Sequence, residues 1–161
     1  MNNLSYLDRQ LDLAAFQGFS ARASQLLPAL AAPGRGGEVL TGLAKLGQRF
    51  LLELFTEKGS LPFAPAQGST FMTEARQGYI RTPADLTAAF TRAMLDIRQH
   101  LVSDTQATDP LDEQFADATL QGVDFSPGAA QLTVALASQD TASQLILPVP
   151  FVFGGPHVHP R

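Results

Sequence analysis

The hydrophobic period of this chain changes once, beyond residue 115, and the change limits the folds that the chain can adopt. Before it, apolar residues recur every three to four positions, as on one face of an α-helix. After it, Leu132, Val134 and Leu136 alternate with smaller or more polar residues, as in a half-buried strand. A helical part followed by a strand part favours the α+β class.

The first predicted helix covers Glu38–Phe55. Its apolar residues form one broad stripe at helical spacing, and Lys45, Gln48, Arg49 and Glu53 fall outside that stripe. We therefore expect these four polar side chains to face solvent.

The second predicted helix covers Pro83–Val102 and has the clearest start. Thr82 offers an N-cap hydroxyl, Pro83 suits the first helical position, and Asp85 is a short form of the capping-box acid. His100 falls on the polar side of this helix. The apolar stripe that should face the core consists of Leu86, Phe90, Ile97 and Leu101.

Three strands in meander order are predicted at Leu120–Phe125, around Leu132–Leu136 and at Gln144–Val152, after a short helical turn near Pro110–Phe115. Two prolines in the last strand lack N–H donors, which confines that strand to a sheet edge. The expected architecture is α+β: two main helices packed on a small antiparallel three-stranded meander, with an N-terminal arm.

The chain divides into an arm with a Pro/Gly-rich joint (1–36), a single α+β domain (37–153) and a C-terminal tail (154–161). The arm fits a helix, yet Leu11–Phe16 also alternates like a strand, and both interpretations stay open. It carries more apolar surface than a free tail should expose. We expect it to bind a neighbouring subunit through Leu11, Leu13, Phe16 and Phe19.

The stretch Thr56–Phe71 between the two helices is rich in Pro and Gly, yet it keeps apolar anchors. It contains no His or Cys and offers only Glu57 as a carboxylate, so its composition indicates assembly and not catalysis. Just beyond it, Arg76 and Arg81 bracket Tyr79. An aromatic residue between two arginines is common in protein contacts. The same composition is equally consistent with an ordinary loop.

Composition excludes several classes of function. Cysteine is absent, which removes disulfides, thiolate metal sites and cysteine nucleophiles. Residues 99–160 hold seven acidic side chains and no Lys or Arg, which argues against binding nucleic acid. We expect no secretory signal, because the N-terminal residues do not show a basic segment followed by an apolar run. We also expect no membrane span, because the longest apolar run is too short to cross a bilayer.

Candidate chemical groups are few. His157 and His159 would face one way in an extended chain, but no third ligand lies nearby, so we expect no metal site. Asp109 and Asp112 are explained by helix capping. Glu57 is the acid candidate for glycoside hydrolysis, although it is better explained as an exposed residue at a helix end. We expect no catalytic centre and no cofactor.

The order helix, Pro/Gly loop, capped helix, acidic turn and meander resembles the small baseplate-wedge, or sheath-initiator, family of contractile phage tails, once described as lysozyme-like. Thr56 and Gly59 are similar to the family's Thr-x-x-Gly at the end of its first helix. Pro65 and Gly68 are similar to the Pro and Gly that follow it. The resemblance covers roughly residues 38–150.

The chain departs from the family pattern at two places. Ser60 stands where the family has an acidic residue. After the second helix the family favours Glu-Pro-Arg, whereas this chain has Asp109 and Pro110 followed by Leu111. These departures concern the family's specific wedge contacts more than its architecture.

The resemblance implies a structural virion subunit, made in the bacterial cytoplasm and present in multiple copies in a ring around the tail tube. Its partners would be the sheath protein, the tube and other baseplate proteins. It would lend a sheet edge to the first sheath ring through main-chain hydrogen bonds. Pro148 and Pro150 leave the last strand only partly available, so Leu11–Phe16 is a rival donor. The alternatives are a tail-completion or neck ring protein, a lysozyme-like hydrolase and a monomeric ligand-binding module.

Overall fold

The structure, a computed structural model, describes residues 12–13, 16–17, 27–28, 39–126, 129–141 and 144–152. The elements, in chain order, are β1 (Asp12–Leu13), β2 (Phe16–Gln17), β3 (Leu27–Pro28), β4 (Val39–Leu40), α1 (Gly42–Phe55), α2 (Phe71–Arg76), α3 (Pro83–Ser103), the 3-10 helix η3 (Leu111–Glu113), β5 (Phe115–Ser126), β6 (Ala129–Ser138) and β7 (Gln144–Val152).

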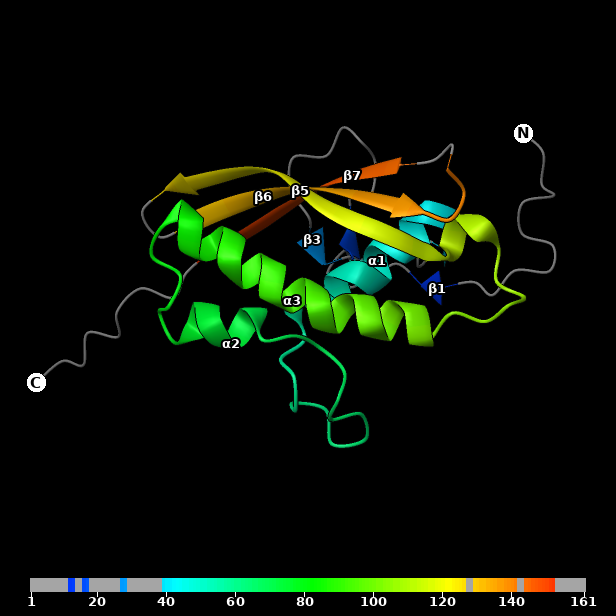
Figure 1. Ribbon diagram of the computed structural model, residues 1–161, viewed down its shortest axis with the longest axis horizontal. Coiled ribbons are helices and arrows are strands. Elements are labelled where there is room, and N and C mark those ends of the chain that lie inside the picture. Colours follow the sequence, from blue (N-terminus) through cyan, green and yellow to red (C-terminus); the bar gives the residue numbers. More distant parts are fainter. Residues whose placement is uncertain are drawn as a thin grey trace, which may run out of the picture.

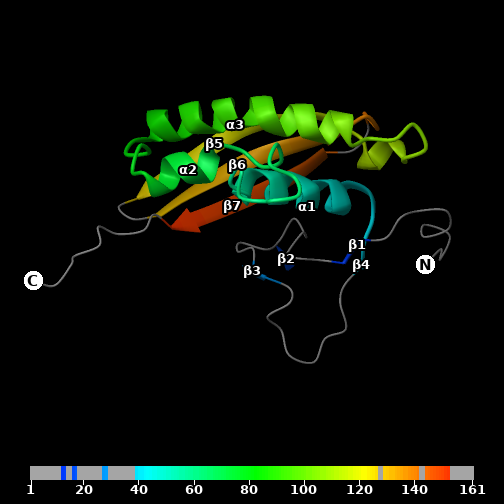
Figure 2. The same cartoon turned by 90° about the horizontal axis from the view of Figure 1, so that it is seen from below.

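Two layers make up the described fold (Figure 1). The strands β5, β6 and β7 form an antiparallel sheet in that spatial order, and the helices lie beneath one of its faces. α3 packs against β5, while α1 runs under β6 and β7. Seen from the helical side, α1 and α3 lie side by side on the same face of the sheet (Figure 2). The predicted α+β class, with two main helices on a three-stranded meander, is confirmed.

α3 begins where the sequence predicts, because its cap is built from neighbouring residues. The Thr82 hydroxyl accepts a hydrogen bond from the Asp85 N–H (3.1 Å), and the Asp85 carboxylate accepts one from the Thr82 N–H (3.0 Å). The two bonds form a capping box, with Pro83 at the first helical position. The helix extends one residue beyond the predicted end.

α1 begins in a different way, and here the sequence-based prediction is wrong. Val39 and Leu40 form strand β4 and not the first helical turn, and the Thr41 side chain makes no cap. Instead the Glu113 carboxylate, from η3, accepts a hydrogen bond from the Gly42 N–H (3.0 Å). A negative charge at this end also interacts favourably with the positive end of the helix dipole.

The polar side of α1 is also less exposed than predicted. Lys45 and Gln48 are buried, and η3 packs against this helix. The Lys45 ammonium lies 2.8 Å from the Glu113 carboxylate, which is itself buried. A buried charge is tolerated only when it is paired, so the contact with η3 explains why a lysine occupies this position.

The six-residue helix α2 was not predicted, because it is too short to show a hydrophobic period. It follows the long loop after α1 and ends just before the α3 cap. Phe71 anchors it in the core, where its ring meets the Phe151 ring edge-on at a centroid distance of 5.4 Å. The short helical turn expected near Pro110–Phe115 is confirmed as η3.

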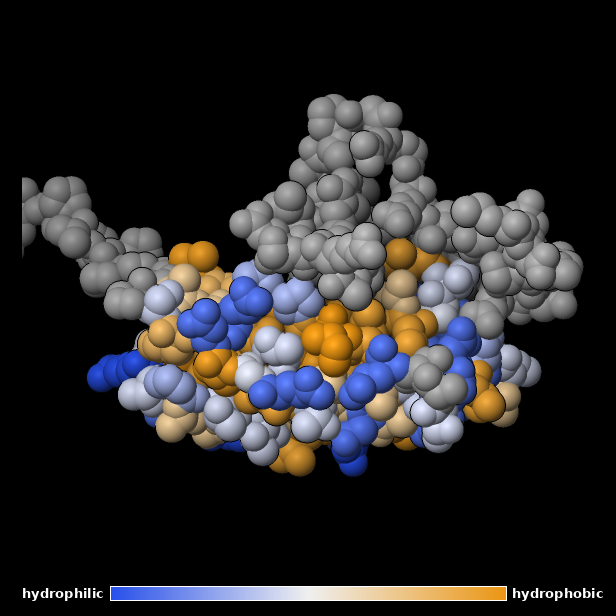
Figure 3. All heavy atoms as spheres, turned by 90° about the horizontal axis from the view of Figure 1, so that it is seen from above, coloured by the Kyte–Doolittle hydropathy of each residue, from blue (hydrophilic) through white to orange (hydrophobic). Residues whose placement is uncertain are grey.

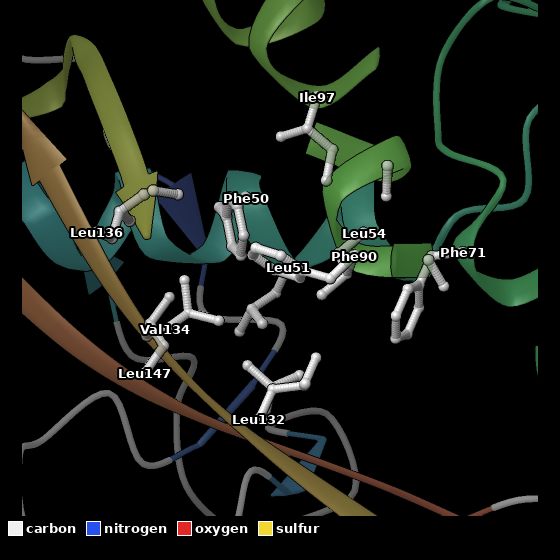
Figure 4. Packing of buried hydrophobic residues seen from close by; sticks show 14 of the residues in the cluster. Phe50, Leu51, Leu54, Phe71, Phe90, Ile97, Leu132, Val134, Leu136 and Leu147 are labelled. Atoms are coloured by element: carbon white, nitrogen blue, oxygen red, sulfur yellow. The ribbon is translucent and has the colours of Figure 1, made fainter. Parts of the chain in front are cut away.

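The core lies between the helices and the sheet (Figure 4). Phe50 of α1 and Phe90 of α3 pack with ring centroids 6.5 Å apart, above the inward-facing residues of β6. All four residues of the predicted α3 stripe are buried. The largest fully buried side chains of the cluster are Phe50, Phe71, Leu46, Leu51, Leu54, Leu86, Ile97, Leu101, Leu132, Leu136, Leu147 and Val134.

The two edges of the sheet differ in what they offer. β7 pairs with β6 continuously, through Thr133 opposite Pro148 and Gln131 opposite Pro150. Because the two prolines occupy alternate positions in an intact ladder, their missing N–H groups fall on the free side of β7. β5, at the other edge, contains no proline and pairs within the described residues only with β6.

The sheet face turned away from the helices carries an apolar area bordered by polar side chains (Figure 3). Alternation along β7 places Ile146 and Val152 on this face, and both are exposed. On β6, Ala135 belongs to the same face and is buried, outside the core cluster. This face is therefore less polar than the outer face of a typical two-layer domain.

Candidate functional site

The loop between α1 and α2 is a chain of hydrogen-bonded turns. Ser60 N–H donates to the Glu57 carbonyl (3.0 Å), Ala64 N–H to the Leu61 carbonyl (3.2 Å) and Gln67 N–H to the Ala64 carbonyl (3.0 Å). The second and third turns carry Pro62 and Pro65 directly after their first residue, where a fixed φ favours the turn. The sequence-based expectation of a loop that holds a shape is confirmed.

The two ends of this loop are joined at its base. Glu57 and Ser69 form a parallel bridge, and Ser69 N–H donates to the Thr56 carbonyl (2.9 Å). The Gly68 N–H donates to the Glu53 carboxylate (2.9 Å), and the Ser69 hydroxyl to the Leu54 carbonyl (3.1 Å). The loop is therefore attached to the last turn of α1 at several points.

The tip of the loop is apolar and exposed. Phe63 has a relative exposure of 101 %, and Leu61 and Pro62 beside it are also exposed. From Gly59 to Thr73, fifteen consecutive residues carry no charged side chain. The loop projects from the helical layer on the side away from the sheet (Figure 1). Depletion of charge around an exposed aromatic is typical of the centre of a protein interface.

A pocket of about 310 Å³ lies between α1, the base of this loop and the end of α3. Its apolar wall is formed by leucines, of which Leu52 and Leu61 are also exposed at the surface. Its polar wall includes Arg49 and Asp104, whose charged groups lie 3.9 Å apart. The pocket is lined by Arg49, Leu52, Glu53, Thr56, Leu61, Gln67, Leu101 and Asp104.

Glu53 connects this pocket to a buried histidine. Its carboxylate lies 2.8 Å from the His100 Nδ1 atom, and both side chains are almost buried. The expectation that Glu53 and His100 sit on polar, solvent-facing sides of their helices is therefore wrong: the two sides face each other. The same Glu53 oxygen accepts the Gly68 N–H, so one carboxylate connects α1, α3 and the loop.

Glu57, the acid candidate for hydrolysis, is held as a carboxylate. The Thr73 hydroxyl donates to it (2.8 Å), and the Arg76 guanidinium donates to both of its oxygens. The hydrogen bond from Thr73, followed by that from Arg76, holds the pKa of Glu57 below its ordinary value. A general acid in glycoside hydrolysis needs a raised pKa, so these contacts favour a structural role.

Arg76 ends α2, and Tyr79 and Arg81 lie in the segment between α2 and α3. Tyr79 is 64 % exposed, and both arginines are exposed. Arg76 holds Glu57, while the Arg81 guanidinium Nε donates to the Gly78 carbonyl (2.9 Å). Both arginine side chains therefore support the local backbone or the loop base, whereas the exposed Tyr79 ring stays a candidate contact group.

Two of the four arm residues fall on described backbone. Leu13 lies in β1, opposite Val39 of β4, and Phe16 lies in β2, opposite Pro28 of β3. The strand interpretation of this region is thus supported at these positions. Leu11 and Phe19 lie outside the described residues, as do His157 and His159 of the tail.

Comparisons with known proteins give no match: no family model, no curated protein and no solved structure is significantly similar to this chain. Within the described ranges, no three His, Asp or Glu side chains are grouped so that they could hold a metal ion. None of the described helices is both long enough and apolar enough to cross a bilayer.

Proposed function

We propose that this chain is a structural subunit of a contractile tail, which binds sheath protein at the baseplate and starts the first sheath ring. The proposal rests on the family resemblance of residues 38–150 and on one observation in the fold, the proline-free outer edge of β5. Its partners would be the sheath, tube and other baseplate proteins, arranged as a ring of several copies.

The contrast between the sheet edges supports β5 as the docking strand. On β7, Pro148 and Pro150 remove two outward N–H groups in a row, which prevents a continuous ladder with an added strand. β5 keeps its N–H groups over twelve residues. Strand addition needs such groups, because main-chain hydrogen bonds provide most of its affinity.

β5 also has features that limit unspecific pairing. Its register with β6 shifts between Leu120 and Gly122, and a bulge of this kind twists an edge. Asp117 and Asp124 are exposed on the strand, and Asp117 pairs with Arg98 of α3. Acidic side chains repel a second copy of the same edge, and they favour an incoming strand that carries Lys or Arg.

Hydrogen–deuterium exchange would test this proposal directly. The purified chain would be mixed with the sheath protein of the same tail, and exchange would be compared with that of the chain alone. We expect amides of β5 to become protected, because those that face the free edge gain carbonyl partners. The amides of β7 serve as the internal control and should not change. Unchanged exchange along β5 in a stable complex would contradict this mode of binding.

Deletion of the gene would test the biological role. We expect tubes with baseplates but without polymerised sheath in electron micrographs, and complementation should restore the sheath. Normal sheaths together with failed joining of heads and tails would instead indicate the tail-completion or neck alternative. Sheathed, infective particles in the absence of the protein would contradict the proposal.

A further inference from the structure

The tip of the α1–α2 loop and the pocket at its base fit each other in size and chemistry. The tip presents a fully exposed phenyl ring at Phe63. The pocket of about 310 Å³ has an apolar part, formed by Leu52, Leu61 and Leu101, and a polar part, formed by Arg49, Glu53, Thr56, Gln67 and Asp104. A protein cavity of about 150 Å³ already holds benzene, so this pocket has room for a benzyl side chain. We propose that Phe63 of one copy inserts into this pocket of a second copy of the chain.

Both partners of the contact lie in one region of the surface, which sets the symmetry. Leu61 belongs to the loop and also lines the pocket, two residues before Phe63. When a knob and its hole are neighbours on one surface, a two-fold axis lets each copy fill the pocket of the other. The contact is then self-complementary and closes as a dimer, with no chain of further copies.

Charge does not oppose a contact between two copies. The tip is neutral from Gly59 to Thr73, so two tips approach each other without repulsion. Inside the pocket, Arg49 is only loosely paired with Asp104, at 3.9 Å. A guanidinium at the face of an inserted ring adds a cation–π attraction. The carboxylates that also line the pocket already have partners: Asp104 pairs with Arg49, and Glu53 contacts His100 and the Gly68 N–H. An inserted phenyl ring would therefore contact the leucines and lie near the Arg49 guanidinium.

The loop is built to present the ring at low entropic cost. Two prolines fix its turns, and its base is bonded to α1 by the Gly68 N–H to Glu53 contact. A loop whose backbone is already ordered before association loses less freedom when it binds. This explains why an uncharged loop is held so firmly while its largest side chain stays in solvent.

Sedimentation equilibrium of the full chain would test the proposal. We expect a monomer–dimer equilibrium with a dissociation constant on the order of 10–1000 μM, because the contact is small. Phe63→Ala removes both symmetric contacts. It should weaken dimerisation at least roughly 100-fold, since each anchoring contact is worth about tenfold or more. The matched control is Leu95→Ala on α3, another exposed apolar residue (74 %), which should leave the equilibrium unchanged.

A mixing experiment separates insertion from mere stacking of two tips. Leu52→Gln makes the pocket wall polar at a residue that is already 42 % exposed, so the fold should persist. Each variant alone loses both contacts. A mixture of Phe63→Ala with Leu52→Gln keeps one intact ring and one intact pocket, so heterodimers should form about tenfold more weakly than the wild-type dimer.

The inference is independent of the proposed tail function, and its failure would be visible in the same measurements. It is overturned if the wild-type chain stays monomeric up to roughly 1 mM, or if Phe63→Ala dimerises like the wild type. It is equally overturned if Leu95→Ala weakens the dimer as much as Phe63→Ala does, or if the mixture forms no heterodimer.

Discussion

Two glycines of the α1–α2 loop share a backbone conformation but differ in their surroundings. Gly59 and Gly68 have φ angles of +84° and +88°, in the left-handed region that side chains disfavour. A Cβ at Gly68 would lie 2.4 Å from the Thr56 carbonyl oxygen, whereas a Cβ at Gly59 would meet nothing within 4 Å. Gly68 is therefore required both by its conformation and by the close approach of the loop base to α1.

The first prediction compares alanine at these two positions. Gly59→Ala adds only conformational strain, on the order of 1–2 kcal/mol in the free energy of unfolding. Gly68→Ala adds the same strain and also pushes two backbone segments apart, for a total on the order of 2–5 kcal/mol. Urea denaturation midpoints at an unchanged m-value would measure both losses. Equal losses for the two variants would mean that the loop base moves freely to accept the extra atom.

At the scale of elements, α3 allows the contribution of its N-cap to stability to be compared with the contribution of its core packing. In the second prediction, Thr82→Ala removes the N-cap oxygen and lowers the free energy of unfolding by about 1 kcal/mol. Phe90→Ala removes a buried ring that packs on Phe50, at a loss of about 3–5 kcal/mol. Chemical denaturation of the purified chain would distinguish these losses. If Phe90→Ala proves as mild as Thr82→Ala, α3 docks on the sheet less firmly than its burial indicates.

The contact between α2 and α3 depends on pH. The Arg92 guanidinium donates two hydrogen bonds to the Glu74 carboxylate, at 2.9 and 2.5 Å. These bonds lower the pKa of Glu74 below its ordinary value of 4.5. Because the folded pKa is depressed, the stabilisation is complete above the unfolded pKa. It is lost as pH falls through the folded pKa.

The third prediction uses Glu74→Gln, which resembles the protonated side chain. The variant should be less stable than the wild type at neutral pH, and this difference should shrink as the pH is lowered below about 4. Denaturation midpoints of both proteins across this range would give the difference. Arg98 pairs with the exposed Asp117, so Asp117→Asn serves as a control with a smaller effect at any pH. A difference that stays constant with pH would show that the ion pair is not the cause.

Sequence patterns predicted the elements whose signals are local. The capping box of α3 lies within four residues, and the alternation of β6 lies within one strand, so both could be inferred. Two contacts could not, because each joins distant parts of the chain: Glu113 with Gly42 and Glu53 with His100 lie 71 and 47 residues apart. A stripe pattern assigned Glu53 and His100 to solvent, since it contains no information about which second element covers the polar side of a helix.

At the scale of the whole molecule, the described members of the core cluster all lie beyond the arm in the sequence. They come from α1, α2, α3, the three strands β5–β7 and Ile80 in the loop before α3, between Leu46 and Val149. The arm reaches this domain through the pairing of β1 with β4, directly before α1. The free energy of folding should therefore come mainly from residues 40–152, whereas the apolar arm residues would serve contacts with other chains.

The last prediction follows from this division. Deleting residues 1–32 removes β1, β2 and β3 but no described member of the core cluster. The truncated chain should unfold cooperatively, with a denaturation midpoint close to that of the full chain, because the buried apolar area of the core is retained. In the proposed tail, however, the truncated chain should fail to complement a deletion of the gene, since the arm would bind the neighbouring subunit. Full complementation would show that the arm is dispensable for assembly, and a loss of cooperative unfolding would show that the arm belongs to the folded domain.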